Sequence, residues 1–108
     1  MIERKRGNDM RLTEQYYMLT PCGLTPVRGQ KYTEDYAITY NHEKKLYNVT
    51  HIKSGTCISK DGFKRMKDCI YAADDLIEIA EKFIAENPER IQKHIDTFNY
   101  CIERNLIN

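Results

Sequence analysis

Apolar and polar residues alternate between positions 36 and 52, which predicts a pair of antiparallel strands. The two strands, residues 36–40 and 45–52, flank the polar loop Asn41-His42-Glu43-Lys44. If Tyr40 pairs with Lys45 across this loop, the apolar side chains gather on one face, namely Tyr36, Ile38, Tyr40, Tyr47 and Val49. A hairpin with one apolar face needs a second layer packed against that face.

Shorter segments on both sides extend this sheet. Residues 14–20 are rich in aromatic and apolar residues and predict a strand that ends before Pro21. A turn at Ser54-Gly55 leads into residues 56–59, which continue the meander as a further strand. Residues 21–32 contain two prolines and two glycines, so we predict a turn-rich connector there.

The C-terminal half carries two apolar stripes with helical spacing. We expect a long helix that begins with Asp61 as N-cap and Gly62 at its entry. This helix should end at Asn87-Pro88, where a second helix should begin with Asn87 as its cap. The first stripe comprises Phe63, Met66, Ile70, Ala73, Ile77, Ala80 and Ile84, widened by Cys69, Leu76 and Phe83; the second comprises Ile91, Ile95, Phe98 and Ile102.

These patterns together predict an α+β fold: a small antiparallel three- to four-stranded β-meander packed against two C-terminal helices. We expect one domain over residues 10–108, preceded by a flexible basic arm over residues 1–9. Met10 is an alternative start to Met1.

Composition narrows the classes of function. The 108-residue chain is 41% hydrophobic and 31% charged, which is typical of a soluble domain, and its net charge of +1 gives no overall attraction to nucleic acids or membranes. No apolar stretch approaches the length of a membrane span, and residues 1–7 are not followed by an apolar region, so we expect no signal peptide and a cytoplasmic protein with no membrane contact. The four cysteines are widely spaced and are expected to be reduced thiols.

Cations cluster where the long helix is predicted to begin. A helix N-terminus is stabilised by anions, so cations there are slightly unfavourable unless an anion is bound. We therefore predict a site for an anion, an acidic partner or nucleic acid at Lys53, Lys60, Lys64, Arg65 and Lys67. A secondary basic patch is predicted at Arg4, Lys5, Arg6 and Arg11. The alternative is that these charges are merely solvated.

Catalytic and metal-binding patterns are not evident in the sequence. The three histidines and four cysteines lack zinc-site spacing, and no glycine-rich phosphate loop occurs. Cys57 and His51 are predicted to point to opposite faces of the sheet, which makes them a poor nucleophile–base pair. We therefore expect no catalytic residues, no metal and no cofactor, and we treat an enzyme assembled from Cys57, His51 or His94 as a third hypothesis.

Residues 47–55, followed by residues 62–68, resemble a pattern in small uncharacterised accessory proteins of phages and mobile genetic elements. In those proteins a V-T-H-x-x-S/T-G hairpin precedes a helix that begins near an aromatic residue, and the resemblance covers about residues 36–85. It implies a small accessory protein that acts by binding, including as an inhibitor of host defence nucleases. It implies no catalytic or binding residues.

The sequence thus predicts a small non-enzymatic protein that binds another macromolecule, either a protein or a nucleic acid. The contact would use the basic start of the long helix or some of the eight tyrosines. Eight tyrosines are too many for the core of so small a domain, so some should reach the surface, where tyrosine favours recognition. Tyr71 and Tyr100 fall beside the apolar stripes of the two predicted helices. The alternative is a regulator that binds nucleic acid directly through the basic helix start or the outer sheet face, which would expose Thr39, Leu46, Asn48 and Thr50. The oligomeric state is left open.

Overall fold

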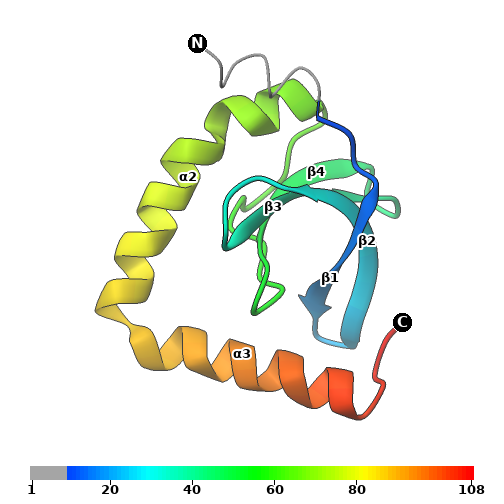
Figure 1. The fold of residues 1–108 in the computed structure, drawn as a ribbon, viewed down its shortest axis with the longest axis vertical. Coiled ribbons are helices and arrows are strands. Elements are labelled where there is room, and N and C mark those ends of the chain that lie inside the picture. Colours follow the sequence, from blue (N-terminus) through cyan, green and yellow to red (C-terminus); the bar gives the residue numbers. More distant parts are fainter. Residues whose placement is uncertain (1–9) are drawn as a thin grey trace.

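The computed structural model describes residues 10–108, so the predicted basic arm at residues 1–9 lies outside the described part. It has an α+β fold in which a four-stranded antiparallel sheet is followed by two helices (Figure 1). The strands follow one another in the sheet in chain order, so the predicted fold class is confirmed. The predicted strand at residues 56–59 is wrong, because only Cys57 of that segment pairs, through an isolated antiparallel bridge to Thr50. The elements are β1 (Glu14–Thr20), β2 (Gly23–Lys31), β3 (Tyr36–Asn41), β4 (Leu46–His51), α2 (Met66–Glu86) and α3 (Pro88–Glu103).

Strand β2 is the largest departure from the sequence prediction, because residues 21–32 were expected to form an irregular connector. Only Pro21 and Cys22 form the turn after β1, and Gly23 takes a positive φ of 123° there. β2 pairs with β1 along its first seven residues but with β3 only from Arg28 onwards. At Pro26 one edge of β2 therefore has no neighbouring strand, so a residue without an N–H is tolerated there.

The β3–β4 hairpin has the predicted apolar face but a register shifted by two residues. Tyr40 pairs with Tyr47 and Ile38 with Val49. The loop occupies residues 42–45, because Asn41 accepts a bond from the backbone N of Lys45 at 2.7 Å and Lys45 adopts a left-handed φ of 58°. A shift of two leaves every side chain on its original face, so the core was predicted correctly although the pairing was wrong.

The main core lies between this hairpin and α2, which runs along the sheet (Figure 1). Ile38 and Val49 from the sheet meet Cys69 and Ala73 from the helix, and all four are fully buried. Partly buried residues surround this centre, including Met66, Ile70, Leu76, Ile77 and Ala80 of the predicted stripe. The helical periodicity therefore identified the buried side of α2 correctly.

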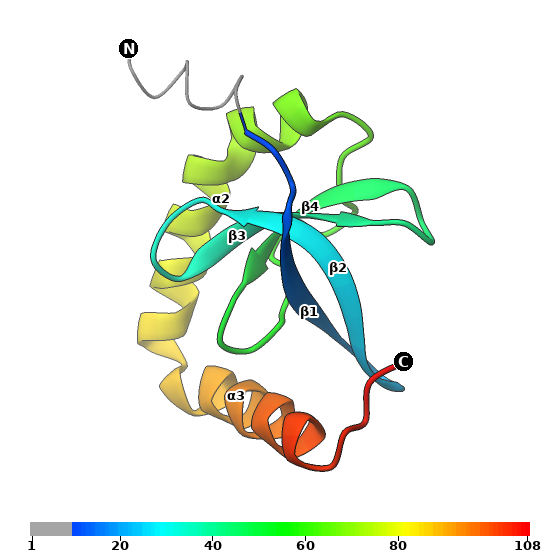
Figure 2. The ribbon, with the colours of Figure 1, turned by 45° about the vertical axis from the view of Figure 1, so that its right-hand side comes forward.

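Helix α3 covers the other end of the sheet, near the β1–β2 turn (Figure 2). The rings of Tyr17 and Phe98 pack edge to face with centroids 6.5 Å apart. The C-terminal tail then returns to β2, where Leu24 N donates to Leu106 O at 2.9 Å and Asn108 N donates to Leu24 O at 2.7 Å. The tail shields the buried Leu24.

The boundaries of both helices differ from the prediction. Helix α2 begins at Met66 rather than near Asp61, because Gly62 turns the chain with a φ of 75° and Phe63 forms an antiparallel bridge with Tyr47. Pro88 does start α3, but the Asn87 side chain donates to Phe83 O of the preceding helix and makes no cap for α3.

On α3, Cys101 is buried and Ile102 is 42% exposed, so the last position of the predicted stripe is wrong. Cys69 and Cys101 are both buried free thiols, as expected for reduced core cysteines.

The second face of the sheet is buried rather than open to a ligand, which contradicts the expected outer face. Thr39, Asn48 and Thr50 are at most 7% exposed. The hydroxyls of Thr39 and Thr50 lie 2.8 Å apart, and Ser59 Oγ donates to Asn48 Oδ1 at 3.1 Å. The sheet is strongly curved (Figure 2), and polar side chains on this face satisfy one another instead of facing solvent.

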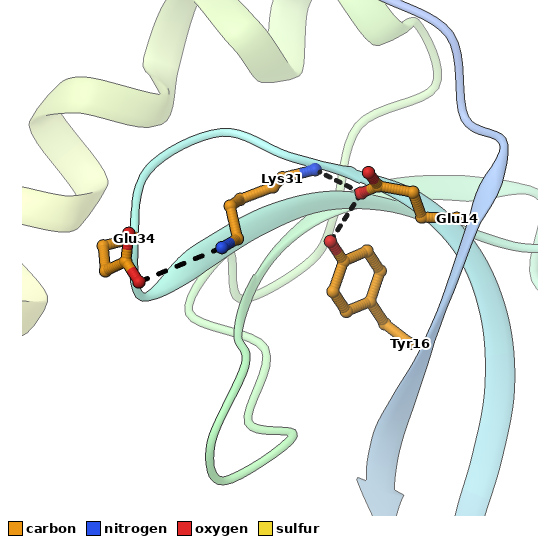
Figure 3. Close-up of polar contacts among 4 residues, drawn as sticks. All are labelled: Glu14, Tyr16, Lys31 and Glu34. Atoms are coloured by element: carbon orange, nitrogen blue, oxygen red, sulfur yellow. Dashed lines mark hydrogen bonds and ion pairs between the residues drawn. The ribbon is translucent and has the colours of Figure 1, made fainter.

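A polar cluster closes the end of the β1–β2 pair (Figure 3). Glu14 Oε1 accepts the hydroxyl of Tyr16 at 2.6 Å and the backbone N–H of Lys31 at 2.9 Å, while Lys31 Nζ lies 3.9 Å from Glu34. The hydrogen bond from Tyr16, followed by that from Lys31, lowers the pKa of Glu14. Partial burial and then the bond to Glu14 raise the pKa of Tyr16 to about 12.

Candidate functional site

The predicted binding residues are all exposed, but most lie before the helix. Lys60, Lys64 and Arg65 belong to the segment between the sheet and α2, and only Lys67 lies in the first turn of the helix. Lys53 lies beyond the C-terminal end of β4. The prediction of a basic helix start is therefore corrected to a basic loop that leads into the helix.

Strand pairing adds two lysines that the sequence prediction missed. Tyr47 and Phe63 exchange backbone hydrogen bonds of 2.7 and 2.8 Å, so the segment after Phe63 runs antiparallel to β4, back toward the loop that holds Lys44 and Lys45. We call the resulting group the basic surface: Lys44, Lys45, Lys60, Lys64, Arg65 and Lys67. The two loop lysines are about 20 residues from Lys64 and Arg65 in sequence, and the bridge brings the loop toward these two residues.

Lys53 does not belong to the basic surface. The loop at residues 42–45 precedes β4 and Lys53 follows it, so the whole strand separates them, roughly 20 Å for six extended residues. Arg11 is exposed and lies before β1. The other members of the secondary patch, Arg4, Lys5 and Arg6, lie outside the described residues.

The basic surface surrounds a helix end that carries no side-chain cap. Arg65 is the N-cap residue of α2 and makes no capping bond; its Nε instead donates to Asp68 at 3.2 Å, between side chains that are 70% and 48% exposed. A pair that is so exposed contributes little to stability. The five lysines of the basic surface make no ion pair with any residue from 10 to 108. The first turn of α2 thus has no side-chain cap, and within residues 10–108 the lysines near it make no ion pair.

Exposed aromatic side chains occur on the helices, as the number of tyrosines predicted. Tyr71 of α2 is 91% exposed and Tyr100 of α3 is 49% exposed. Other tyrosines hold α2 in place, since the hydroxyl of Tyr32 donates to Asp74 and that of Tyr36 to Glu81. Burial, followed by the bond to Glu81, raises the pKa of Tyr36.

A second feature, which sequence reasoning did not find, is a cavity of about 310 Å³ at the corner where α2 meets α3. It is bounded by the segment after β4 and by both helices. Its lining is mainly apolar, with histidines and an arginine among the apolar side chains: His51, Thr56, Ile58, Ala80, Phe83, Ile84, Arg90, Ile91 and His94. No spacing in the sequence indicates this site, because it combines residues from three separate segments.

A chain of hydrogen bonds joins the two histidines of the cavity. His51 Nδ1 lies 2.8 Å from Ser54 Oγ, which donates to Thr56 Oγ1 at 2.9 Å. Thr56 Oγ1 lies 3.4 Å from His94 Nδ1. Since the only proton of Ser54 is given to Thr56, His51 must donate from Nδ1. The His51 ring is thus held by a side-chain hydroxyl.

The environment of His51 favours its neutral form. The residue is 6% exposed, and burial lowers its pKa, although the carboxylates of Asp35 and Glu81 oppose this effect. Cys57 instead faces Thr50, with 3.7 Å between sulfur and hydroxyl, and burial raises its pKa. Cys57 therefore has neither the thiolate character nor the neighbouring base of a nucleophile.

Residues 10–108 contain no group of three His, Cys, Asp or Glu side chains arranged to hold a metal ion. In the same part of the chain, neither helix is apolar enough over a sufficient length to cross a membrane.

Comparison of the whole chain with protein-family models, with curated proteins and with solved structures gives no significant match in any of the three.

Proposed function

We propose that this chain is a small non-enzymatic binding protein whose basic surface contacts the acidic surface of a partner protein. The observation that supports this proposal is the Tyr47–Phe63 bridge, because it gathers cations from two distant segments around an uncapped helix end. Lysines that make no ion pair within residues 10–108 lose no ion pair of that part of the chain when they meet an acidic partner. Complementary charge of this kind accelerates association and gives specificity.

A protein partner is favoured over a nucleic acid for two reasons. Glu43, Asp61 and Asp68 lie among the cations, so the basic surface lacks the uniform positive potential that phosphate backbones attract. The sheet face that could have read bases is buried and internally hydrogen-bonded. The resemblance to accessory proteins of phages and mobile elements supports the same proposal, including a role as an inhibitor of a nucleic-acid-handling system.

The proposal is tested by capture from a lysate of the native host, with and without nuclease treatment. The variant Lys60→Glu/Lys64→Glu/Lys67→Glu should lose a nuclease-resistant protein partner, with an affinity at least tenfold weaker for the purified pair. The matched control is Lys82→Glu/Lys93→Glu/Arg104→Glu, which reverses three exposed cations outside the basic surface, on α2, on α3 and directly after α3. This control should retain the partner.

Equal capture by both triple variants would refute the role of the basic surface. Loss of all capture after nuclease treatment would instead support the alternative, direct nucleic-acid binding, whose affinity should fall steeply with salt because phosphate contacts release counterions. Thermal unfolding of both variants shows whether a loss of capture is simply a loss of fold.

A further inference from the structure

The cavity at the α2–α3 corner has the composition of a small-molecule site. Aliphatic side chains line it from three segments: Ile58 follows β4, Ala80 and Ile84 lie on α2, and Ile91 lies on α3. All four are only partly buried, and they lie where the two helices diverge after Asn87-Pro88 (Figure 1). At about 310 Å³, the cavity lies at the lower end of the range for ligand pockets.

The cavity lining contains a permanent positive charge and no permanent negative charge. Arg90 is the one permanently charged residue of the lining, and no Asp or Glu lines the cavity. The guanidinium lies over the ring of Phe83, 5.9 Å from its centroid, and makes no ion pair with any described residue. His94 lies four residues after Arg90, hence on the same face of α3.

Arg90 and His94 can thus meet a single anion, while the aliphatic residues contact an apolar body. Arginine binds a carboxylate through two parallel hydrogen bonds, and the guanidinium of Arg90 lies over the ring of Phe83, which also lines the cavity. We propose that the cavity binds a small organic carboxylic acid with an aromatic or branched aliphatic body, its carboxylate held by Arg90 and His94. This site is separate from the basic surface and does not depend on the proposed function.

The test uses 3-phenylpropanoate as the probe and follows backbone amides of the full chain by two-dimensional NMR. We expect saturable shifts centred on Thr56, Phe83 and His94, with a Kd of about 0.6–4 mM, the range that ordinary ligand efficiency gives for a compound of this size. The neutral analogue 3-phenylpropan-1-ol should bind roughly tenfold more weakly, because it cannot form the charge-assisted bonds.

The matched variants are Arg90→Gln and Arg104→Gln. Both arginines lie on or next to α3 over an aromatic ring, Arg104 being 4.9 Å from the centroid of Tyr100, but only Arg90 lines the cavity. Arg90→Gln should weaken binding of the acid about tenfold, and Arg104→Gln should leave it unchanged. Ala80→Leu, which fills the cavity, should weaken the acid and the alcohol alike.

Three outcomes would overturn the proposal: no saturable shifts with the acid, equal affinity for acid and alcohol, or equal effects of the two arginine variants. A carboxylate beside an apolar group also occurs at the C-terminus of a peptide. An N-acetylated pentapeptide that ends in Phe provides that comparison. If it binds tenfold more tightly than 3-phenylpropanoate, the occupant is a chain terminus and the small-molecule proposal is wrong.

Discussion

Ser59 provides a sharp test of how the segment after β4 is attached to the sheet. It is 2% exposed, and its Oγ accepts the backbone N–H of Val49 at 3.0 Å while donating to Asn48 Oδ1 at 3.1 Å. A side-chain hydroxyl thus takes the place of a neighbouring strand's carbonyl along β4. The same segment carries Thr56 and Ile58 to the cavity, so its attachment positions both.

The substitution Ser59→Ala removes both hydrogen bonds and introduces almost no new volume. Val49 is fully buried, so its N–H would have no water to replace the lost acceptor. A buried polar group left unsatisfied costs about 1–3 kcal/mol, and two groups are affected here. We expect the free energy of unfolding to fall by about 2–3 kcal/mol, and the melting temperature of a domain of this size by roughly 10 °C.

Urea unfolding followed by circular dichroism measures this loss, and hydrogen exchange locates it at the Val49 amide. Thr33→Ala, at an exposed turn residue, is the control and should change the free energy of unfolding by no more than about 0.5 kcal/mol. A loss below about 0.5 kcal/mol for Ser59→Ala, with unchanged exchange at Val49, would show that the hydroxyl does not hold this segment.

Three further predictions concern titration and reactivity. Burial lowers the pKa of His51 below its ordinary 6.5, so as the pH falls His51 is protonated in the unfolded chain before it is protonated in the folded one. The free energy of unfolding should therefore decline below about pH 6.5. His51→Gln should flatten this decline when unfolding is measured as a function of pH. Tyr16→Phe should raise the pKa of Glu14 toward its ordinary value, as NMR titration would show, because it removes the main bond to the carboxylate. The exposed Cys22 should react with a thiol reagent at pH 8 many times faster than Cys69, whose pKa burial raises to about 12.

Each of these predictions has a control within the chain. His42→Gln alters a solvent-exposed loop histidine, and a flattening of the pH dependence as large as that of His51→Gln would exclude the buried ring as its source. Tyr17→Phe alters a hydroxyl that accepts a bond from Gln15 and does not touch Glu14, whose pKa should stay depressed. Rapid labelling of Cys69 in the folded protein would contradict its burial.

Local patterns predicted those parts of the fold that depend on neighbours in sequence. The spacing of Cys69, Ala73 and Ile77 identified the buried side of α2, and Asn87-Pro88 located the break between the helices. Strand β2 was missed because two prolines and two glycines suggest turns, whereas β1 and β3 supply partners that outweigh this local preference.

The sequence by itself determined the class of fold, the apolar face of the β3–β4 hairpin, the buried side of α2 and the break between the two helices, because these follow from local side-chain periodicity and from Pro88. Tertiary structure alone decided which charges share a surface and where the chain leaves space. Because Tyr47 and Phe63 form a bridge, Lys44 and Lys45 join the basic surface, and α2 begins only at Met66. The cavity likewise exists only because α2 and α3 diverge over the segment after β4. Both features join residues far apart in the chain, and no local spacing encodes such contacts.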